Sequence, residues 1–168
     1  MKRLFFLLST IIILFGCNGN KKQAAYECED YLNKAYEALD DGYYQVTQAR
    51  RDPNLYNARN FLDRAERCFD DASSYAKKAA DIASDYDYDV ESFAKKASSH
   101  ANDASNYARK AASTNENYEI DRYTQSSQSC ASDGQKDIKD AKVGDELQTE
   151  LKNGILISKI VEVKENGK

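Results

Sequence analysis

A five-residue unit recurs through the middle of this chain: an aromatic residue, any residue, a polar residue, Lys or Arg, and then Ala. The copies begin at Tyr31, Phe61, Tyr75, Phe93 and Tyr107. Two ten-residue segments, 71–80 and 103–112, are identical at eight positions. Such self-similarity indicates internal duplication of one helical segment. The fold is therefore expected to consist mainly of copies of that helix.

The spacing of the apolar residues supports this expectation. Between Ala24 and about Ala112 they recur every three or four residues, which is the period of an amphipathic helix. The predicted buried positions are Cys28, Tyr31, Ala35, Leu39, Gly42 and Val46 in a first helix, Phe61, Ala65, Cys68, Ala72, Tyr75, Ala79 and Ile82 in a second, and Phe93, Ala97, Ala101, Ala104, Ala108 and Ala111 in a third. Two copies of the unit follow their predecessors by two heptads, as in a coiled coil. Small residues along such a seam allow helix axes to approach closely.

Break signals divide this region into a mainly α, antiparallel bundle of three to four helices over residues 24–134. Asp52 before Pro53 predicts the N-cap of the second helix, and Asp89 predicts that of the third. Ser113 and Glu116 have the spacing of a capping box, which predicts a weaker fourth helix from Asn115 to about Ser132. The connections are short, so successive helices are expected to run antiparallel. Gly42 is a candidate kink in the first helix.

Residues 142–168 differ in composition from the helical region. β-branched residues predict strands over Leu147–Leu151 and Ile155–Val163, with a hairpin turn at Asn153-Gly154. Two strands alone are marginally stable in water. The hairpin is therefore expected to pack on the helices, to pair with a partner's sheet, or to stay partly disordered, and the first of these is favoured.

The N-terminus has the organisation of a signal peptide over residues 1–16. Lys2 and Arg3 precede an apolar run from Leu4 to Phe15, which is too short to span a membrane. The run ends in Leu14-Phe15-Gly16-Cys17, which resembles the lipobox of bacterial lipoproteins. That resemblance implies cleavage before Cys17, a diacylglycerol on its sulfur and an acyl chain such as palmitate on its amino group. Residues 17–23 would then be the lipidated cysteine and a polar tether.

Several acyl chains hold a protein on a membrane very stably, so the resemblance implies a protein anchored in the bacterial cell envelope. The residue directly after Cys17 is Asn18 and not Asp. By analogy with enteric lipoproteins, this implies the outer membrane and a protein that faces the periplasm.

Charge restricts the partners of the mature protein. The whole chain has a net charge of −4, and removal of sixteen residues with two basic side chains leaves 152 residues with a net charge of −6. An acidic body disfavours nucleic acid as a partner. An unknown envelope protein is the expected partner, besides the membrane that Cys17 reaches through its lipid, and no cofactor is expected.

Three further cysteines, Cys28, Cys68 and Cys130, fall in the apolar register. The envelope is oxidising, so one disulfide is possible, and a returning fourth helix makes Cys28–Cys130 the favoured pair. The competing interpretation is three small buried thiols without a disulfide.

Two polar features are candidate sites for chemistry. Asp85, Asp87 and Asp89 have the opening spacing of a calcium loop, but that loop's glycine and bidentate glutamate are replaced by Val90 and Lys96. The three carboxylates are therefore only a weak metal candidate. The single histidine, His100, is expected to be exposed on a helix and to pair locally with Asp103, with no nucleophile motif beside it.

Tyr86 and Tyr88 lie near a predicted helix break and form a possible protein interface, because exposed tyrosine is favoured at interfaces. The sequence thus favours a lipid-anchored, non-enzymatic envelope protein with a helical protein-interaction or spacer module. The alternative is a lipoprotein that binds a small ligand or calcium through the acidic loop 85–89.

Overall fold

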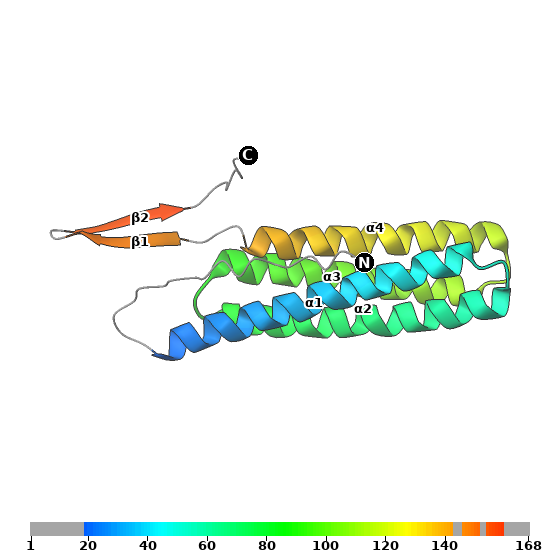
Figure 1. Cartoon of the computed structure of the whole chain (residues 1–168), viewed down its shortest axis with the longest axis horizontal. Coiled ribbons are helices and arrows are strands. Elements are labelled where there is room, and N and C mark those ends of the chain that lie inside the picture. The colour runs from blue at the N-terminus through cyan, green and yellow to red at the C-terminus, as the bar shows by residue number, and fades with distance from the viewer. Residues whose placement is uncertain (1–18, 143–145, 152–153, 160–168) are drawn as a thin grey trace, which may run out of the picture.

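The helical region forms one four-helix bundle. The computed structural model describes residues 19–142, 146–151 and 154–159. The helices are α1 (Gly19–Arg51), α2 (Leu55–Ala83), α3 (Tyr88–Ser113) and α4 (Asn117–Lys142), and successive helices run antiparallel (Figure 1). The chain is thus mainly α, with four helices packed against each other. The predicted signal peptide and Cys17 lie outside the described residues.

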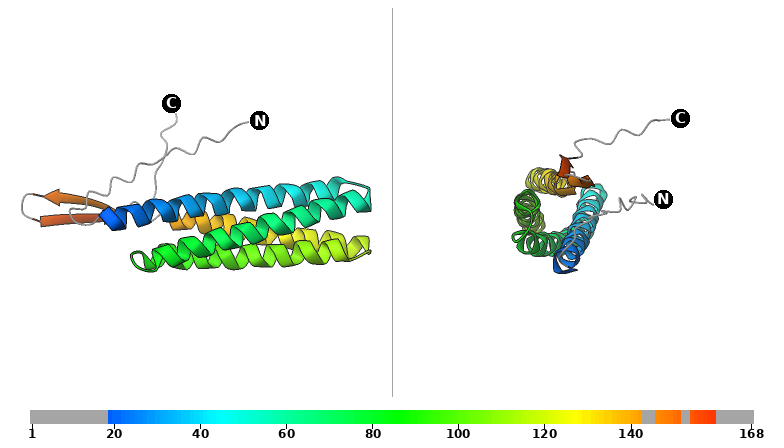
Figure 2. Two further views of the ribbon diagram at one scale, coloured as in Figure 1. Left: turned by 90° about the horizontal axis from the view of Figure 1, so that it is seen from below. Right: turned by 90° about the vertical axis from the view of Figure 1, so that its left-hand side faces the viewer.

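The helices are arranged around a square. Each helix packs against its two neighbours, while the diagonal pairs make few contacts, and the view along the bundle in Figure 2 shows this ring. The connections 52–54 and 114–116 lie together at one end, which we call the two-loop end. The connection 84–87 lies at the other end, the one-loop end, together with the start of α1 and the end of α4.

α2 begins about two residues later than the sequence predicted, and α3 begins about two residues earlier. Asn54, not Asp52, caps α2: its side chain accepts hydrogen bonds from the backbone of Tyr56 and Asn57. Asp87, not Asp89, caps α3 by accepting from the backbone N–H of Val90 at 3.0 Å. In both cases the capping residue has the extended backbone that a helix requires just before its first turn.

The predicted start of the fourth helix was also wrong in detail. Ser113 is the last residue of α3, and its hydroxyl donates to the carbonyl of Lys110. Instead, the hydroxyl of Thr114 accepts a hydrogen bond from the backbone N–H of Glu116 and donates one to the carboxylate of Glu119 in the first turn of α4.

Two glycines allow close contacts between helices rather than breaking them. α1 continues through Gly42, and a Cβ at that position would lie 2.3 Å from Cε1 of Phe69. α4 continues through Gly134 to Lys142, well beyond the predicted end, and a Cβ at Gly134 would meet Leu39 at 3.2 Å. Both glycines therefore serve contacts between helices. The helix α1 is continuous through Gly42, so the expected interruption there is absent.

The core consists mostly of alanine. Its largest fully buried apolar side chains are Phe69, Leu39, Leu62, Ile138 and Val46, and most other buried positions are Ala. In α2 the predicted positions Phe61, Cys68, Tyr75 and Ile82 are only half-buried. The centre of the α2 seam lies one residue further along, at Leu62, Phe69, Ala76 and Ala83. α2 contacts both α1 and α3, so its buried stripe is wider than a single seam.

All five copies of the repeated unit pack in the same way. The aromatic ring is half-buried, the cation three residues later lies 5.1–5.9 Å from the ring centroid, and the final alanine is fully buried. Residues three apart share a helix face, which explains the constant spacing. The rings also connect helices, because Tyr31 stacks on Tyr75 and Tyr107 stacks on Tyr123. The unit is therefore a repeated device for packing helices.

Two short strands follow the bundle. β1 (Glu146–Leu151) and β2 (Gly154–Lys159) pair antiparallel, with Leu151 opposite Gly154. Asn153, which was predicted as a turn residue, and 160–163, predicted as the end of the second strand, lie outside the described residues.

Candidate functional site

The predicted lipidation site lies directly before the bundle. Cys17 is outside the described residues, and α1 begins at Gly19, two residues later. The predicted tether 17–23 is therefore too long, because Gly19–Gln23 already belong to α1. Any anchor on Cys17 would be joined to the one-loop end of the bundle almost directly.

The predicted interface pair is divided by the structure. Tyr88 opens α3 and is 80% exposed. Tyr86 packs against the core beside Cys28, and burial together with the Cys28 thiol raises the pKa of its hydroxyl. Because Tyr86 is half-buried, it contributes to the closure of the one-loop end, and only Tyr88 presents its ring to solvent.

The acidic loop does not assemble a metal site. Asp87 uses its carboxylate to cap α3, and Asp89 lies in the first turn of that helix. Within residues 19–142, no three His, Cys, Asp or Glu side chains gather closely enough to hold a metal ion. The interpretation of Asp85, Asp87 and Asp89 as ligands fails because two of them belong to the start of a helix.

His100 joins two helices instead of pairing within its own. Its Nδ1 lies 2.8 Å from Oδ2 of Asp137 in α4, whereas the sequence predicted a pair with Asp103. His100 also lies beside the buried Gly134. A Cβ added to Gly134 would lie 3.5 Å from the Cβ of His100. The imidazole therefore helps to hold α4 on α3.

The cysteines do not form the predicted pair. Cys28, Cys68 and Cys130 are free thiols, and Cys28 donates to the carbonyl of Ala79 in α2. The Gln135–Asp40 hydrogen bond sets the register of α4 on α1 and places Cys130 level with about residue 45 of α1. Cys28 is then about 25 Å away along the axis, at 1.5 Å per residue. A disulfide tolerates only about 7 Å between Cα atoms.

Burial raises the pKa of all three thiols above the ordinary value of 9.0. Fewer thiolates are present between pH 7 and 9 than in a free cysteine, and the thiolate is the nucleophile. We expect iodoacetamide to alkylate the folded Cys17→Ala chain more slowly than the same chain in guanidinium, with the buried Cys28 slowest. Peptide mass spectrometry measures each rate. Equal rates for the folded and unfolded chains at Cys28 would contradict the described burial.

Large apolar side chains are exposed at the two-loop end. Leu55, Tyr56 and Tyr118 lie in the first turns of α2 and α4, and the two tyrosines are 73% and 76% exposed. These residues were not predicted from the sequence. The sequence feature that indicates their exposure is their position just after a helix start, because side chains in the first turn have no preceding turn to pack against.

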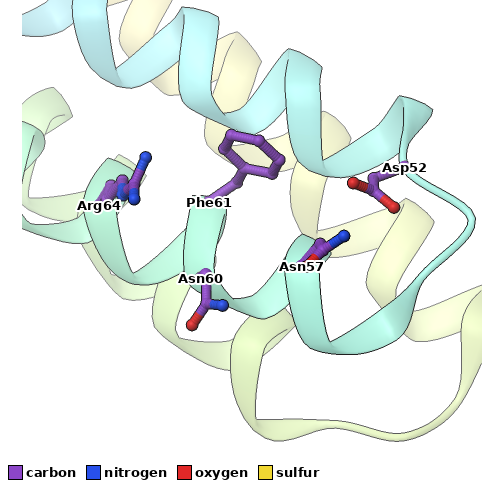
Figure 3. Close-up of a pocket in the computed structure, with 5 residues that line it drawn as sticks. All are labelled: Asp52, Asn57, Asn60, Phe61 and Arg64. Carbon is purple, nitrogen blue, oxygen red and sulfur yellow. The ribbon is translucent and has the colours of Figure 1, made fainter.

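A shallow hollow lies at the same end. It has a volume of about 160 Å³ between the end of α1 and the first turns of α2, and Figure 3 shows its lining. The lining residues are Asp52, Asn57, Asn60, Phe61 and Arg64. The hollow thus combines one aromatic ring with amide, carboxylate and guanidinium groups.

Arginines connect the segments that meet at the two-loop end. Arg59 of α2 donates to the backbone carbonyl of Thr114 at 3.2 Å and to the side chain of Asn115. Arg50 of α1 forms an ion pair with Asp121 of α4 at 2.9 Å. In the described part of the chain, the Nε of Arg59 is one of two buried side-chain atoms without a hydrogen-bond partner. Long-range contacts therefore hold the connection 114–116 on α2 and the end of α1 on α4.

Comparisons with protein-family models, with curated proteins and with solved structures give no match to this chain. Within the described helices, none has the length and apolar character needed to cross a membrane.

Proposed function

We propose that this chain is a lipid-anchored, non-enzymatic protein of the bacterial envelope whose bundle holds a protein-interaction surface away from the membrane. The proposed anchor is Cys17, on the resemblance of residues 14–17 to a lipobox. α1 begins two residues later and has 33 residues, so it is about 50 Å long. On this proposal the one-loop end lies near the membrane, and the two-loop end lies far from it.

The observation that carries the proposal is the exposure of Leu55, Tyr56 and Tyr118 together at the two-loop end. Aromatic side chains with low conformational entropy are enriched where proteins contact one another. These residues lie on helices, and Arg50 and Arg59 connect those helices to neighbouring segments, so the surface would need little ordering on binding.

The alanine core suits a spacer. Helices that meet through small residues approach closely, and the rings of three of the five repeated units, at Tyr31, Tyr75 and Tyr107, stack on rings of neighbouring helices. A bundle of this kind would carry a surface at a fixed distance from its anchor.

The C-terminal β-hairpin over residues 142–168 belongs to this proposal. β-branched residues in this segment and the pairing of β1 with β2 support it. The described strands contact each other and extend beyond the one-loop end, so the expected packing of the hairpin on the helices is not seen in the described residues (Figure 1). A chain that ends at Lys142 is therefore expected to melt at the same temperature as the full chain. A lower melting temperature of the shortened chain would show that the tail does stabilise the bundle.

In-cell crosslinking tests the proposed function. Cells that produce the tagged full-length protein are treated with a membrane-permeable amine-reactive crosslinker, and the products are resolved by mass. We expect a discrete adduct with another envelope protein, and the Tyr56→Ala/Tyr118→Ala variant should lose it. Uncrosslinked protein alone, at crosslinker doses that link a known envelope complex, would contradict the proposal.

A further inference from the structure

The two kinds of basic residue occupy different ends of the bundle. Every arginine of the described helices lies within residues 50–67 or 109–122, next to the two-loop end: Arg50, Arg51, Arg59, Arg64, Arg67, Arg109 and Arg122. The lysines of the described helices lie elsewhere, with the exception of Lys110. The segregation appears only when the helices are folded antiparallel, because the arginines come from all four helices.

This distribution reverses the local charge. Residues 50–67 and 109–122 together have eight basic and six acidic side chains, whereas the remainder of the helical body is acidic. The same segments contain the exposed Tyr56 and Tyr118 and five asparagines. Arginine and tyrosine are enriched at protein interfaces, and lysine is depleted there. The two-loop end therefore combines exposed aromatic rings with arginine, whereas the exposed tyrosines elsewhere, such as Tyr88, lie on an acidic part of the bundle.

Several of these arginines are already held in place. Arg109 forms an ion pair with Glu66 at 2.7 Å, and Arg50 pairs with Asp121. Arg64 lies over the ring of Phe61, 5.9 Å from its centroid, and lines the hollow shown in Figure 3. A guanidinium that rests on a ring keeps its hydrogen-bond donors available for a carboxylate. Arg51, on the last turn of α1, is exposed.

We propose that the two-loop end binds an acidic surface of a protein partner. Arg51 and Arg64 receive carboxylates of that partner, and Tyr56 and Tyr118 cover its apolar atoms. This inference rests on the proposed function and adds to it the location of the interface and the chemistry of the partner. Charge complementarity selects the partner class, because this end alone is basic on an acidic molecule.

Site-specific photo-crosslinking tests the inference in intact cells. A photoreactive phenylalanine replaces Tyr56 in the tagged full-length protein, and the control chain has it at Tyr88 of the one-loop end. We expect an adduct with another protein from position 56 only, at a partner peptide rich in Asp and Glu. The variant Arg51→Glu/Arg64→Glu should reduce the adduct about tenfold or more, since like charges then face each other.

A matched control isolates the effect of position from the effect of charge. Lys77→Glu/Lys136→Glu makes the same change in charge at two exposed lysines outside the two-loop segments, and it should leave the adduct unchanged. Circular dichroism of each variant verifies folding. Reversal of the acidic residues on the partner's crosslinked peptide to Arg should restore the adduct with Arg51→Glu/Arg64→Glu.

The remaining outcomes separate the two proposals. A heteromeric adduct from Tyr88 but not from Tyr56 would overturn the inference and retain the proposed function. An adduct with a second copy of this chain or with glycan, or one that survives Arg51→Glu/Arg64→Glu, would also overturn the inference. Absence of an adduct from both positions would overturn the inference and count against the proposed function as well.

Discussion

Replacement of Phe69 with Ala is expected to lower the free energy of unfolding by about 3–5 kcal/mol, the range for removal of a buried aromatic side chain. Phe69 is fully buried and is the largest side chain of a core that otherwise consists mostly of alanine. Its ring occupies the space that Gly42 leaves open on α1. The surrounding alanines are too small to fill the cavity, so the loss should lie near the upper end of the range.

The contact between Phe69 and Gly42 makes this prediction more specific. Gly42→Ala alone should cost about 1–3 kcal/mol, because its methyl group would collide with the ring. The double variant Gly42→Ala/Phe69→Ala should lose less than the sum of the two single losses, because that methyl enters the new cavity. Urea unfolding followed by circular dichroism measures all three. Tyr44→Ala, at an exposed position of α1, is the control and should change stability by about 0.5 kcal/mol or less. Additive losses would contradict the described packing.

Cys17→Ala is expected to move the protein from the membrane fraction to the soluble fraction. Several acyl chains at about 0.8 kcal/mol per buried methylene make an anchor effectively permanent, and its loss leaves an acidic helical body. The described helices contain no segment that could cross a membrane in its place. Fractionation of cells that produce each chain, followed by immunoblotting, measures the change.

The control for this experiment is Cys28→Ala, which removes a thiol of the bundle and keeps the proposed anchor. It should remain in the membrane fraction, as is expected of the wild-type chain. If Cys17→Ala also stays on the membrane and is released only by detergent, the lipid anchor would be wrong.

Periodicity was sufficient to predict the helices but not their precise partners. The predicted seam of α1 is buried as expected at Cys28, Ala35, Leu39, Gly42 and Val46. In α2 the predicted alanines Ala65, Ala72 and Ala79 are fully buried. Phe61 and Tyr75 looked like core residues and are half-buried edge residues. An aromatic ring followed three residues later by Lys or Arg is adapted to a half-buried edge, where the cation can cover it. The following alanine then reaches the centre.

The candidate surface could not be located from local sequence. Tyr86 and Tyr88 are two residues apart and looked equivalent, but Tyr86 closes the bundle end beside Cys28 and Tyr88 faces solvent. Tyr56 and Tyr118 are 62 positions apart, and only the antiparallel fold brings their helix starts to one end. The pairing of His100 with Asp137 was invisible for the same reason, because it depends on the register of α4 on α3.

The most direct measurement for the central claim is the mass of the N-terminal peptide of the protein purified from its native membrane. We expect this peptide to begin at Cys17, with a diacylglycerol on the sulfur and an acyl chain on the amino group. Loss of the mass of residues 1–16 and gain of the lipid mass would appear together. A peptide that retains Met1–Gly16, or one that begins at an unmodified Cys17, would contradict it.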